Sequence, residues 1–294
     1  VVLLGVGFEL WEAWSKELGY SRPEGMGSKR KLDELSQAFG NTGGDLWFHV
    51  KSDCEAEAQR LQGLIVERLQ GLYSREPLIV PAKKRHQGKV LGGRFIDGLE
   101  NPADAEDLSD RVVIGEEDAP NRGGAFLLTQ KFVHDWTKLN AMSELQKENM
   151  IGRDHKDRLV PMDDESSHIK RVRQLDGQRI NFRIVRQALP YGHKTDNKAN
   201  EEGVFFAGYV KATHAIDRIL DGIAGSQKGF IQDSLFSATR SHHGSYWFVP
   251  SRLQCGLDPC PASGEITMNE YFNYRSKNGY MFYNARDYQH KVRT

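Results

Sequence analysis

The chain has 294 residues, of which 38% are hydrophobic and 27% are charged, a balance typical of globular proteins rather than of disordered or membrane chains. Lysine plus arginine and aspartate plus glutamate number 40 each, so the formal net charge is zero. A nucleic-acid-binding protein normally has a basic excess, so we expect no nucleic-acid partner. No apolar run approaches the roughly 18 residues of a membrane span, so we expect no membrane partner either.

The start of the chain and its cysteines bear on location. Residues 1–6 form an apolar run too short for a secretory signal, and no Met precedes it, so we expect the chain to begin inside the fold. Cys54, Cys255 and Cys260 are too few for a disulfide framework and too irregular for a four-ligand zinc site. We therefore predict reduced thiols in a cytoplasmic protein.

The first half of the chain has strand and helix signals in alternation. Residues 1–6 and 45–51 are predicted strands, and Asp53 is the predicted N-cap of a helix that runs to about Gln70 with apolar residues at helical spacing. Strand-like segments follow at 78–80 and around Val90. Residues 103–123 are acidic and contain Gly and Pro, so they are predicted to form a surface connection.

The second half has a fuller pattern. The predicted elements are a strand at 125–130, a helix at about 135–150, strands at 180–185 and 204–210, a helix around 216–223 and a strand at 246–249. Strand, helix, strand, strand, helix, strand is the ferredoxin-like order. The first half shows only the later part of that order, as if its first strand and helix were missing.

We therefore predict an α+β protein made of two ferredoxin-like halves that leave a cavity between sheet and helices. The N-terminal half is predicted at 1–122 and the C-terminal half at 123–251. Residues 252–294 are rich in Tyr, Asn and Arg with weak periodicity, and form an extension to which no role is assigned.

Three separate segments hold candidate site residues. Residues 92–102 contain Asp97-Gly98 and Asn101-Pro102, which are turn signals, and their backbone freedom would also let the loop lie against a ligand. Arg186 lies in an apolar strand, where a buried guanidinium needs a partner, so a structural salt bridge is the alternative. His168 precedes a predicted strand, and a lone histidine is more often structural than a ligand.

Together these segments resemble the dye-decolorising peroxidases, in particular the class B branch. Asp97 is assigned to that family's Gly-x-x-Asp-Gly motif, His168 follows it by 71 residues, and Arg186 follows His168 by 18. The resemblance extends from near residue 1 to about residue 251 and includes 44–51, 129–135, 151–153 and 244–251.

The resemblance implies a peroxidase that holds haem b in the C-terminal half of a dimeric α/β-barrel type of fold. It implies reduction of hydrogen peroxide through a ferryl intermediate and oxidation of small phenolic or dye-like donors. His168 is then the proximal ligand of the haem iron. Asp97 moves a proton between the peroxide oxygens, and Arg186 stabilises the charge on the departing oxygen. Because family members commonly assemble, a homo-oligomer is expected.

Other roles follow from the same resemblance, each with an alternative. Asp233 is expected to accept a hydrogen bond from His168, or else to be a helix cap or surface residue. Arg153 is expected to hold a haem propionate, or else to form a surface ion pair. Phe205 and Phe206 are expected to wall the haem pocket, or else to pack in the core.

Two further features concern individual positions. Ala188 occupies a place where the family often has a polar Asn or Ser, so this chain lacks a side-chain donor for water or peroxide at that position. Trp47, Trp136 and Trp247 could relay electrons from bulky donors, although packing is the favoured reading of each. A haem carrier or sensor, and a haem-degrading or iron-releasing protein, are the alternative functions on such a scaffold.

Overall fold

The computed structural model contains one large antiparallel sheet and two short hairpins. It describes residues 1–27, 31–74, 76–82, 89–102, 105–161, 164–175, 178–179, 184–192, 201–226 and 231–256. Six strands pair in the order β2-β1-β10-β5-β9-β8. Their bounds are β1 (Val2–Gly7), β2 (Leu46–Val50), β5 (Ala125–His134), β8 (Val185–Tyr191), β9 (Gly203–Val210) and β10 (Thr239–Val249). The hairpins pair β3 (Lys89–Val90) with β4 (Phe95–Ile96), and β6 (Gln174–Leu175) with β7 (Gln178–Arg179).

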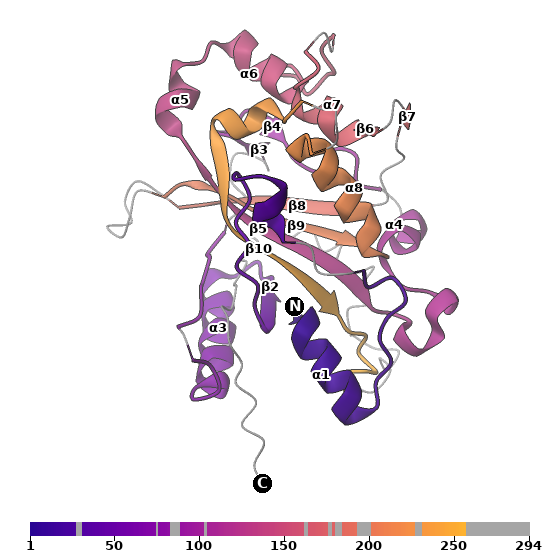
Figure 1. Ribbon diagram of the computed structural model, residues 1–294. Helices are drawn as coiled ribbons and strands as arrows, with labels where there is room; N and C mark the ends of the chain where they lie inside the picture. The colour runs from indigo at the N-terminus through magenta and orange to yellow at the C-terminus, as the bar shows by residue number, and fades with distance from the viewer. Residues whose placement is uncertain are drawn as a thin grey trace.

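The helices lie on both faces and at one end of the sheet. They are α1 (Phe8–Leu18), α2 (Leu32–Leu35), α3 (Glu55–Leu69), α4 (Ala105–Val112), α5 (Trp136–Ala141), α6 (Glu144–Ile151), α7 (His168–Arg173) and α8 (Thr213–Ala224), with 3-10 helices η2 (Glu116–Asn121) and η3 (Ser234–Ser237). Figure 1 shows α5, α6 and α7 gathered with the β3–β4 hairpin at one end of the sheet. Among the described residues, no helix has the length and apolar character needed to cross a membrane.

The second half of the chain has the ferredoxin-like arrangement that its pattern predicts. In the order β5, helices, β8, β9, α8, β10, the first strand β5 and the third strand β9 are central neighbours. The last strand β10 flanks β5, and the second strand β8 flanks β9. The α+β fold class is therefore confirmed. Because β1 pairs with β10, strands from the first part of the chain extend the same sheet, and the proposed division at residue 122 stays a prediction.

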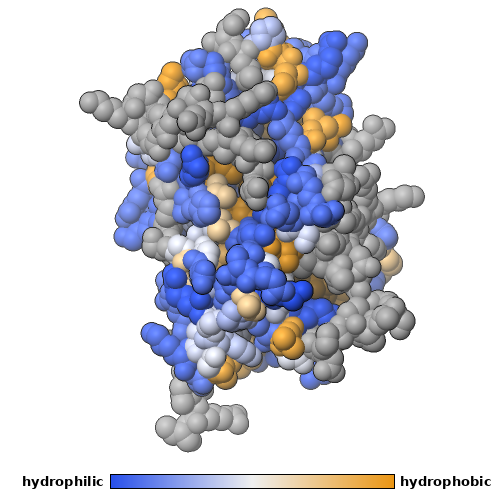
Figure 2. Space-filling model, turned by 90° about the vertical axis from the view of Figure 1, so that its right-hand side faces the viewer, coloured by the Kyte–Doolittle hydropathy of each residue, from blue (hydrophilic) through white to orange (hydrophobic). Residues whose placement is uncertain are grey.

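Alternation along the strands produces two core layers. In β5, Leu127 packs on one face with Trp47, Trp247 and α4, whereas Phe126 packs on the other face with α1 and α8. This period of two is what an extended backbone imposes on a strand covered on both sides. Trp47 and Trp247 are fully buried in this way, so packing accounts for them. Figure 2 shows an outer face dominated by hydrophilic residues, with hydrophobic ones in small separate groups.

Several predicted elements differ from the observed ones. The helix predicted at 135–150 is divided into α5 and α6, because Ser143 and Gln146 form a capping box that begins a second helix. Residues 105–112 are a helix rather than part of a surface connection, and Leu108 and Val112 of this helix are buried against the sheet. The N-cap position of α3 is occupied by Cys54 and not by Asp53.

Other differences concern strands and chain ends. Residues 78–80 form no strand, although Ala82 makes a single bridge to Tyr191. In the predicted strand 180–185, residues 180–183 lie outside the described residues, and β8 begins at Val185. Helix α1 was not predicted. Cys54 and Cys255 are free thiols, while Cys260 and the rest of 257–294 lie outside the described residues.

Candidate active site

A large cavity lies between the α8-covered face of the sheet and the helices at its end. Its volume, taken as the space open to the centre of a water molecule, is about 190 Å³. One water needs roughly 10–15 Å³ by that measure, so the cavity accommodates a ligand much larger than peroxide. The apolar residues of its lining include Val90, Leu91, Phe95, Ile96, Leu128, Phe132, Ile151, Ile169, Val172, Ile184, Phe206, Ile216, Ile219, Leu220, Ile223, Leu235 and Phe236.

His168 lies at the start of α7 and lines this cavity, and Asp233 contacts its Nδ1. The carboxylate Oδ2 of Asp233 lies 2.5 Å from His168 Nδ1, and Oδ1 of the same carboxylate accepts from the Leu235 backbone N–H at 2.9 Å. The two alternatives considered for Asp233 therefore coexist: it is the histidine's partner and the cap of η3. A carboxylate acceptor at Nδ1 keeps the proton on that nitrogen and leaves the Nε2 lone pair for a metal.

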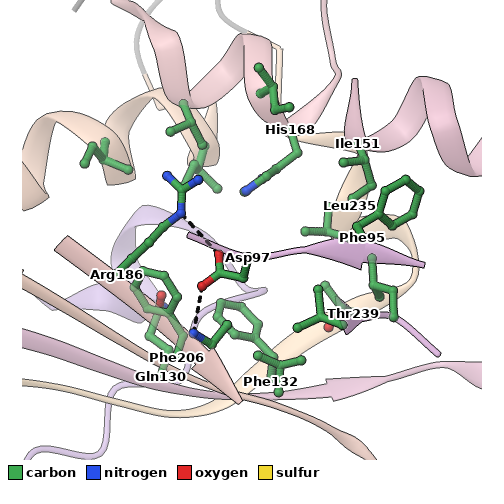
Figure 3. A pocket seen from close by; sticks show the side chains of 18 of the residues that line it. Phe95, Asp97, Gln130, Phe132, Ile151, His168, Arg186, Phe206, Leu235 and Thr239 are labelled. Carbon is green, nitrogen blue, oxygen red and sulfur yellow. Dashed lines mark hydrogen bonds and ion pairs between the residues drawn. The ribbon is translucent and has the colours of Figure 1, made fainter. Parts of the chain in front are cut away.

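The segment before His168 is fastened to η3 as well. Ser234 donates to the Ser166 carbonyl from its backbone N–H at 2.8 Å and from its hydroxyl at 3.0 Å. Asp233 is buried, with 2% of its surface exposed. The imidazole therefore has a fixed position and tautomer, and Figure 3 shows it pointing into the cavity toward Arg186 and Asp97.

Asp97 and Arg186 form an ion pair on the wall opposite His168 (Figure 3). Asp97 Oδ1 lies 3.1 Å from Arg186 Nε, and Asp97 Oδ2 accepts from the Ala188 backbone N–H at 2.8 Å. Both side chains are partly shielded from solvent, with 17% of Asp97 and 25% of Arg186 exposed. Position 188 thus orients the carboxylate with a backbone donor, although its side chain is apolar.

Asn101, which lies in a predicted turn, positions Arg186. Its side-chain amide donates to the Arg186 carbonyl at 2.6 Å and accepts from the Arg186 backbone N–H at 3.1 Å. The same loop needs Gly98, which has φ +77° and where a Cβ would lie 2.8 Å from the Asn101 amide nitrogen. The loop and β8 are therefore joined at the residue that carries the guanidinium.

The match to the Gly-x-x-Asp-Gly motif is incomplete at its first position. The residue three before Asp97 is Arg94, so the motif's first glycine is absent, whereas Asp97 and Gly98 are both present. Arg94 is not among the residues that line this cavity, and its guanidinium contacts Glu144.

Arg153 also lines the cavity, at the end of α6. Its guanidinium donates to the Asp157 carbonyl at 2.7 Å and to Glu100 Oε1 at 2.7 Å, and Arg173 contacts the same Glu100 oxygen. The ion pair considered for Arg153 therefore exists. Arg153 also lines the cavity, and a guanidinium suits a carboxylate of a bound ligand.

The two phenylalanines that were expected to wall the pocket lie on opposite faces of the sheet. Phe206 lines the cavity, whereas Phe205 is 1% exposed and packs in the core of the opposite face. The prediction for Phe205 is wrong, because consecutive residues of a strand point to opposite faces of the sheet.

Three polar residues of the lining, Gln130, His134 and Thr239, were not predicted as site residues. Gln130 and His134 lie on β5 and line the cavity, and Gln130 Nε2 and His134 Nε2 have no hydrogen-bond partner among the described residues. His134 Nδ1 lies 2.9 Å from Thr239 Oγ1, and burial lowers the pKa of His134 to about 4. A neutral ring with an open nitrogen is therefore present beside the cavity at neutral pH.

The residues present fit haem. An apolar lining suits the faces of a porphyrin, and a single imidazole with an anchored Nδ1 suits the iron. Arg153 suits a propionate, and the Asp97–Arg186 pair lines the same cavity as His168. His168, Asp97, Arg186, Arg153 and Phe206 are thus brought to one cavity, with Asp233 behind His168.

Comparisons with known proteins agree with this geometry. Residues 89–254 match the family model described as the C-terminal region of Dyp-type peroxidases. A dye-decolorizing peroxidase of Rhodococcus erythropolis is 25% identical over 253 residues, which cover 85% of this chain and 71% of that protein.

Solved structures have the same fold. A variant of Rhodococcus jostii DypB in complex with heme has a TM-score of 0.71 at 25% identity, covering 86% of this chain and 80% of its own. A dye-decolorizing peroxidase of Bacteroides thetaiotaomicron has a TM-score of 0.69 at 25% identity, covering 87% and 80%.

Proposed function

This chain belongs to the Dyp-type peroxidase family, a family of haem peroxidases, and from that premise we propose how its own residues act. His168 holds the iron of haem b through Nε2, and Arg153 holds a propionate. When bound, haem supplies two electrons to hydrogen peroxide and recovers them one at a time from phenolic or dye-like donors. The other steps depend on the side chains around the cavity.

Asp233 acts through His168. Its carboxylate accepts a hydrogen bond from the Nδ1–H of His168 at 2.5 Å. This bond fixes the imidazole ring and makes Nε2 a stronger electron donor. Because Asp233 is buried and also caps η3, the pair has little freedom to move.

Asp97 moves the proton that peroxide cleavage requires. It accepts a proton on a carboxylate oxygen from one peroxide oxygen and returns it to the other, which leaves as water; such a step is worth about 10²–10⁴ in rate. Arg186 Nε and the Ala188 N–H orient the two carboxylate oxygens. The Arg186 guanidinium, which does not readily lose its proton, stabilises negative charge on the departing oxygen.

This proposal depends on one observation: the Asp97–Arg186 pair lies across the cavity from His168, whose Nδ1 is hydrogen-bonded to a carboxylate. A haem carrier or sensor needs a ligand for iron but has no use for an acid–base residue over the open side. The pair therefore favours peroxidase chemistry over transport.

The test uses the haem-loaded protein with hydrogen peroxide and guaiacol, a simple phenol. We expect peroxide-dependent oxidation of guaiacol, and we expect His168→Ala to lose both this activity and the absorption band of ligated haem. His155→Ala is the matched control, because His155 is exposed and pairs with Glu148 away from the cavity. Normal haem absorption in His168→Ala would refute the ligand assignment.

Two further expectations stay predictions from the sequence. These are assembly with copies of the same chain, which sedimentation of the purified protein can test, and a cytoplasmic location, which fractionation of cells can test.

A further inference from the structure

A second cavity lies beside the first, between the β3–β4 hairpin and helices α5 and α6. Its volume, on the same measure, is about 140 Å³. A cavity of roughly 150 Å³ is enough to bind benzene in a protein interior, so this one has room for a single aromatic ring. Leu91 and Phe95 line both cavities, so the two spaces share a wall.

The second cavity carries an excess of positive charge. Among the described residues, its lining includes two cations, Arg94 and Lys147, and no carboxylate. Glu144, outside the lining, contacts both: Arg94 through its guanidinium and Lys147 at 3.4 Å. One carboxylate thus faces two cations, and Lys147 is only 10% exposed. Burial, with a contribution from the Arg94 charge, lowers the pKa of Lys147.

Within the part of the chain that the structure describes, Arg94 and Lys147 share a single carboxylate, so their charges are incompletely compensated. A buried ammonium is costly unless it is paired, and the Glu144 carboxylate is 60% exposed and shared with Arg94. An anionic group placed between Arg94 and Lys147 would remove this imbalance, and guanidinium and ammonium groups both suit a carboxylate.

Trp136 supplies an aromatic wall to the same cavity. Its six-membered ring lies against Gly92, where a Cβ would be 3.5 Å from the indole carbons and where φ is +74°. The indole also packs edge-to-face on His134, with ring centroids 5.6 Å apart. Since His134 lines the main cavity, these two rings connect the two spaces.

We propose that the second cavity binds an aromatic donor bearing an anionic group, with its ring beside Trp136 and its anion between Arg94 and Lys147. The site is the entry point for a phenolic acid, an assignment that rests on the proposed peroxidase function. For each hydrogen peroxide reduced to two water molecules, two donor molecules each lose one electron and their phenolic proton. The electrons leave the donor through the contact between the Trp136 and His134 rings.

Calorimetry on the haem-loaded protein without peroxide tests binding by itself. The probes are vanillate and guaiacol, which are the same methoxyphenol with and without a carboxylate. We expect the protein to bind vanillate more tightly than guaiacol. Arg94→Gln and Lys147→Gln are each expected to weaken vanillate binding about tenfold, the usual size of a lost charged hydrogen bond, and to leave guaiacol unchanged.

Two further variants control for unspecific effects. Lys147→Arg keeps the charge and is expected to keep vanillate affinity. Lys138→Gln removes an exposed cation of α5 that does not line the cavity, and is expected to bind as the parent does. Equal vanillate affinity in the parent and in both glutamine variants, or no vanillate binding to the parent, would overturn the proposal.

Steady-state kinetics then separates this site from the peroxidase function. Arg94→Gln and Lys147→Gln should raise KM for vanillate about tenfold with little change in kcat, while guaiacol oxidation stays at the parental rate. If the parent oxidises neither donor, the proposed function fails, and calorimetry still decides whether the cavity binds an aromatic anion.

Discussion

Asp233 Oδ2 lies 2.5 Å from His168 Nδ1, while Asp233 Oδ1 accepts from the Leu235 backbone N–H at 2.9 Å. One buried carboxylate therefore fixes both the imidazole and the beginning of η3. The relationship joins residues that are 65 positions apart in the chain. It explains how a histidine at the first position of a six-residue helix can have a defined orientation.

Asp233→Asn should weaken the electron donation from His168 without removing the histidine. Asparagine keeps the shape and can still accept the η3 cap, but it lacks the negative charge. We expect haem to remain bound, its reduction potential to rise, and the peroxide reaction to slow by about 10–100-fold. Spectroelectrochemistry and stopped-flow mixing measure the two effects, with the exposed Asp33→Asn as control. An unchanged potential would show that the carboxylate has no electronic role.

The distal pair predicts two separable losses. Asp97→Asn removes the proton-accepting group and should slow the peroxide reaction by about 10²–10⁴. Arg186→Gln removes the charge over the departing oxygen and should cost about 10²–10³. In both variants the haem absorption band should persist, because neither residue is its ligand. If Asp97→Asn reacts as fast as the parent, another group carries the proton.

Local patterns predicted much of the fold, because alternation and helical spacing are set within a few residues. The strands β5, β9 and β10 and the helix α8 were expected near their observed places. The residues that line the cavity were harder to predict. Whether Phe205 or Phe206 faces it depends on which face of β9 meets α8, and that is fixed by packing in the whole sheet.

Long-range contacts explain most of what was missed at the site. The Asn101–Arg186 contact spans 85 positions, and nothing near Asn101 distinguishes it from an ordinary turn residue. Gln130 and His134 belong to a strand whose pattern indicates burial but not a cavity beside it. By contrast, His168, Asp97 and Arg186 were found through motif order, which carries information that burial patterns do not.

Asn101→Ala tests whether that contact positions Arg186. The change removes two hydrogen bonds to the Arg186 backbone, each worth about 0.5–1.5 kcal/mol, so we expect the free energy of unfolding to fall by about 1–3 kcal/mol. Because Arg186 then loses its fixed place, the peroxide reaction should slow while haem affinity stays the same. Urea unfolding and stopped-flow mixing measure these effects. A destabilised variant with the parental peroxide rate would leave Asn101 a purely structural role.

His134 predicts a pH dependence of stability. Burial lowers its pKa from 6.5 to about 4, so between these values the unfolded chain binds more protons than the folded one. Stability should therefore fall as the pH falls from about 6.5 to 4, by about 3 kcal/mol from this group. His134→Gln should remove that part of the slope. Urea unfolding across this range measures the difference between the two proteins, and curves that stay parallel would contradict the assignment. His155→Gln, at an exposed site, should follow the parent.

Phe205 and Phe206 are adjacent residues with different expected effects. Phe205 is 1% exposed in the core beneath the sheet, so Phe205→Leu should lower the free energy of unfolding of the haem-free protein by about 1–2 kcal/mol and leave haem affinity unchanged. Phe206 lines the main cavity, so Phe206→Leu should weaken haem binding with a smaller effect on stability. Urea unfolding and haem titration compare the two variants directly. Haem affinity that responds to Phe205→Leu and not to Phe206→Leu would mean that the Phe205 face of β9 borders the haem, and the assignment of the haem site to the cavity that His168 and Phe206 line would fail with it.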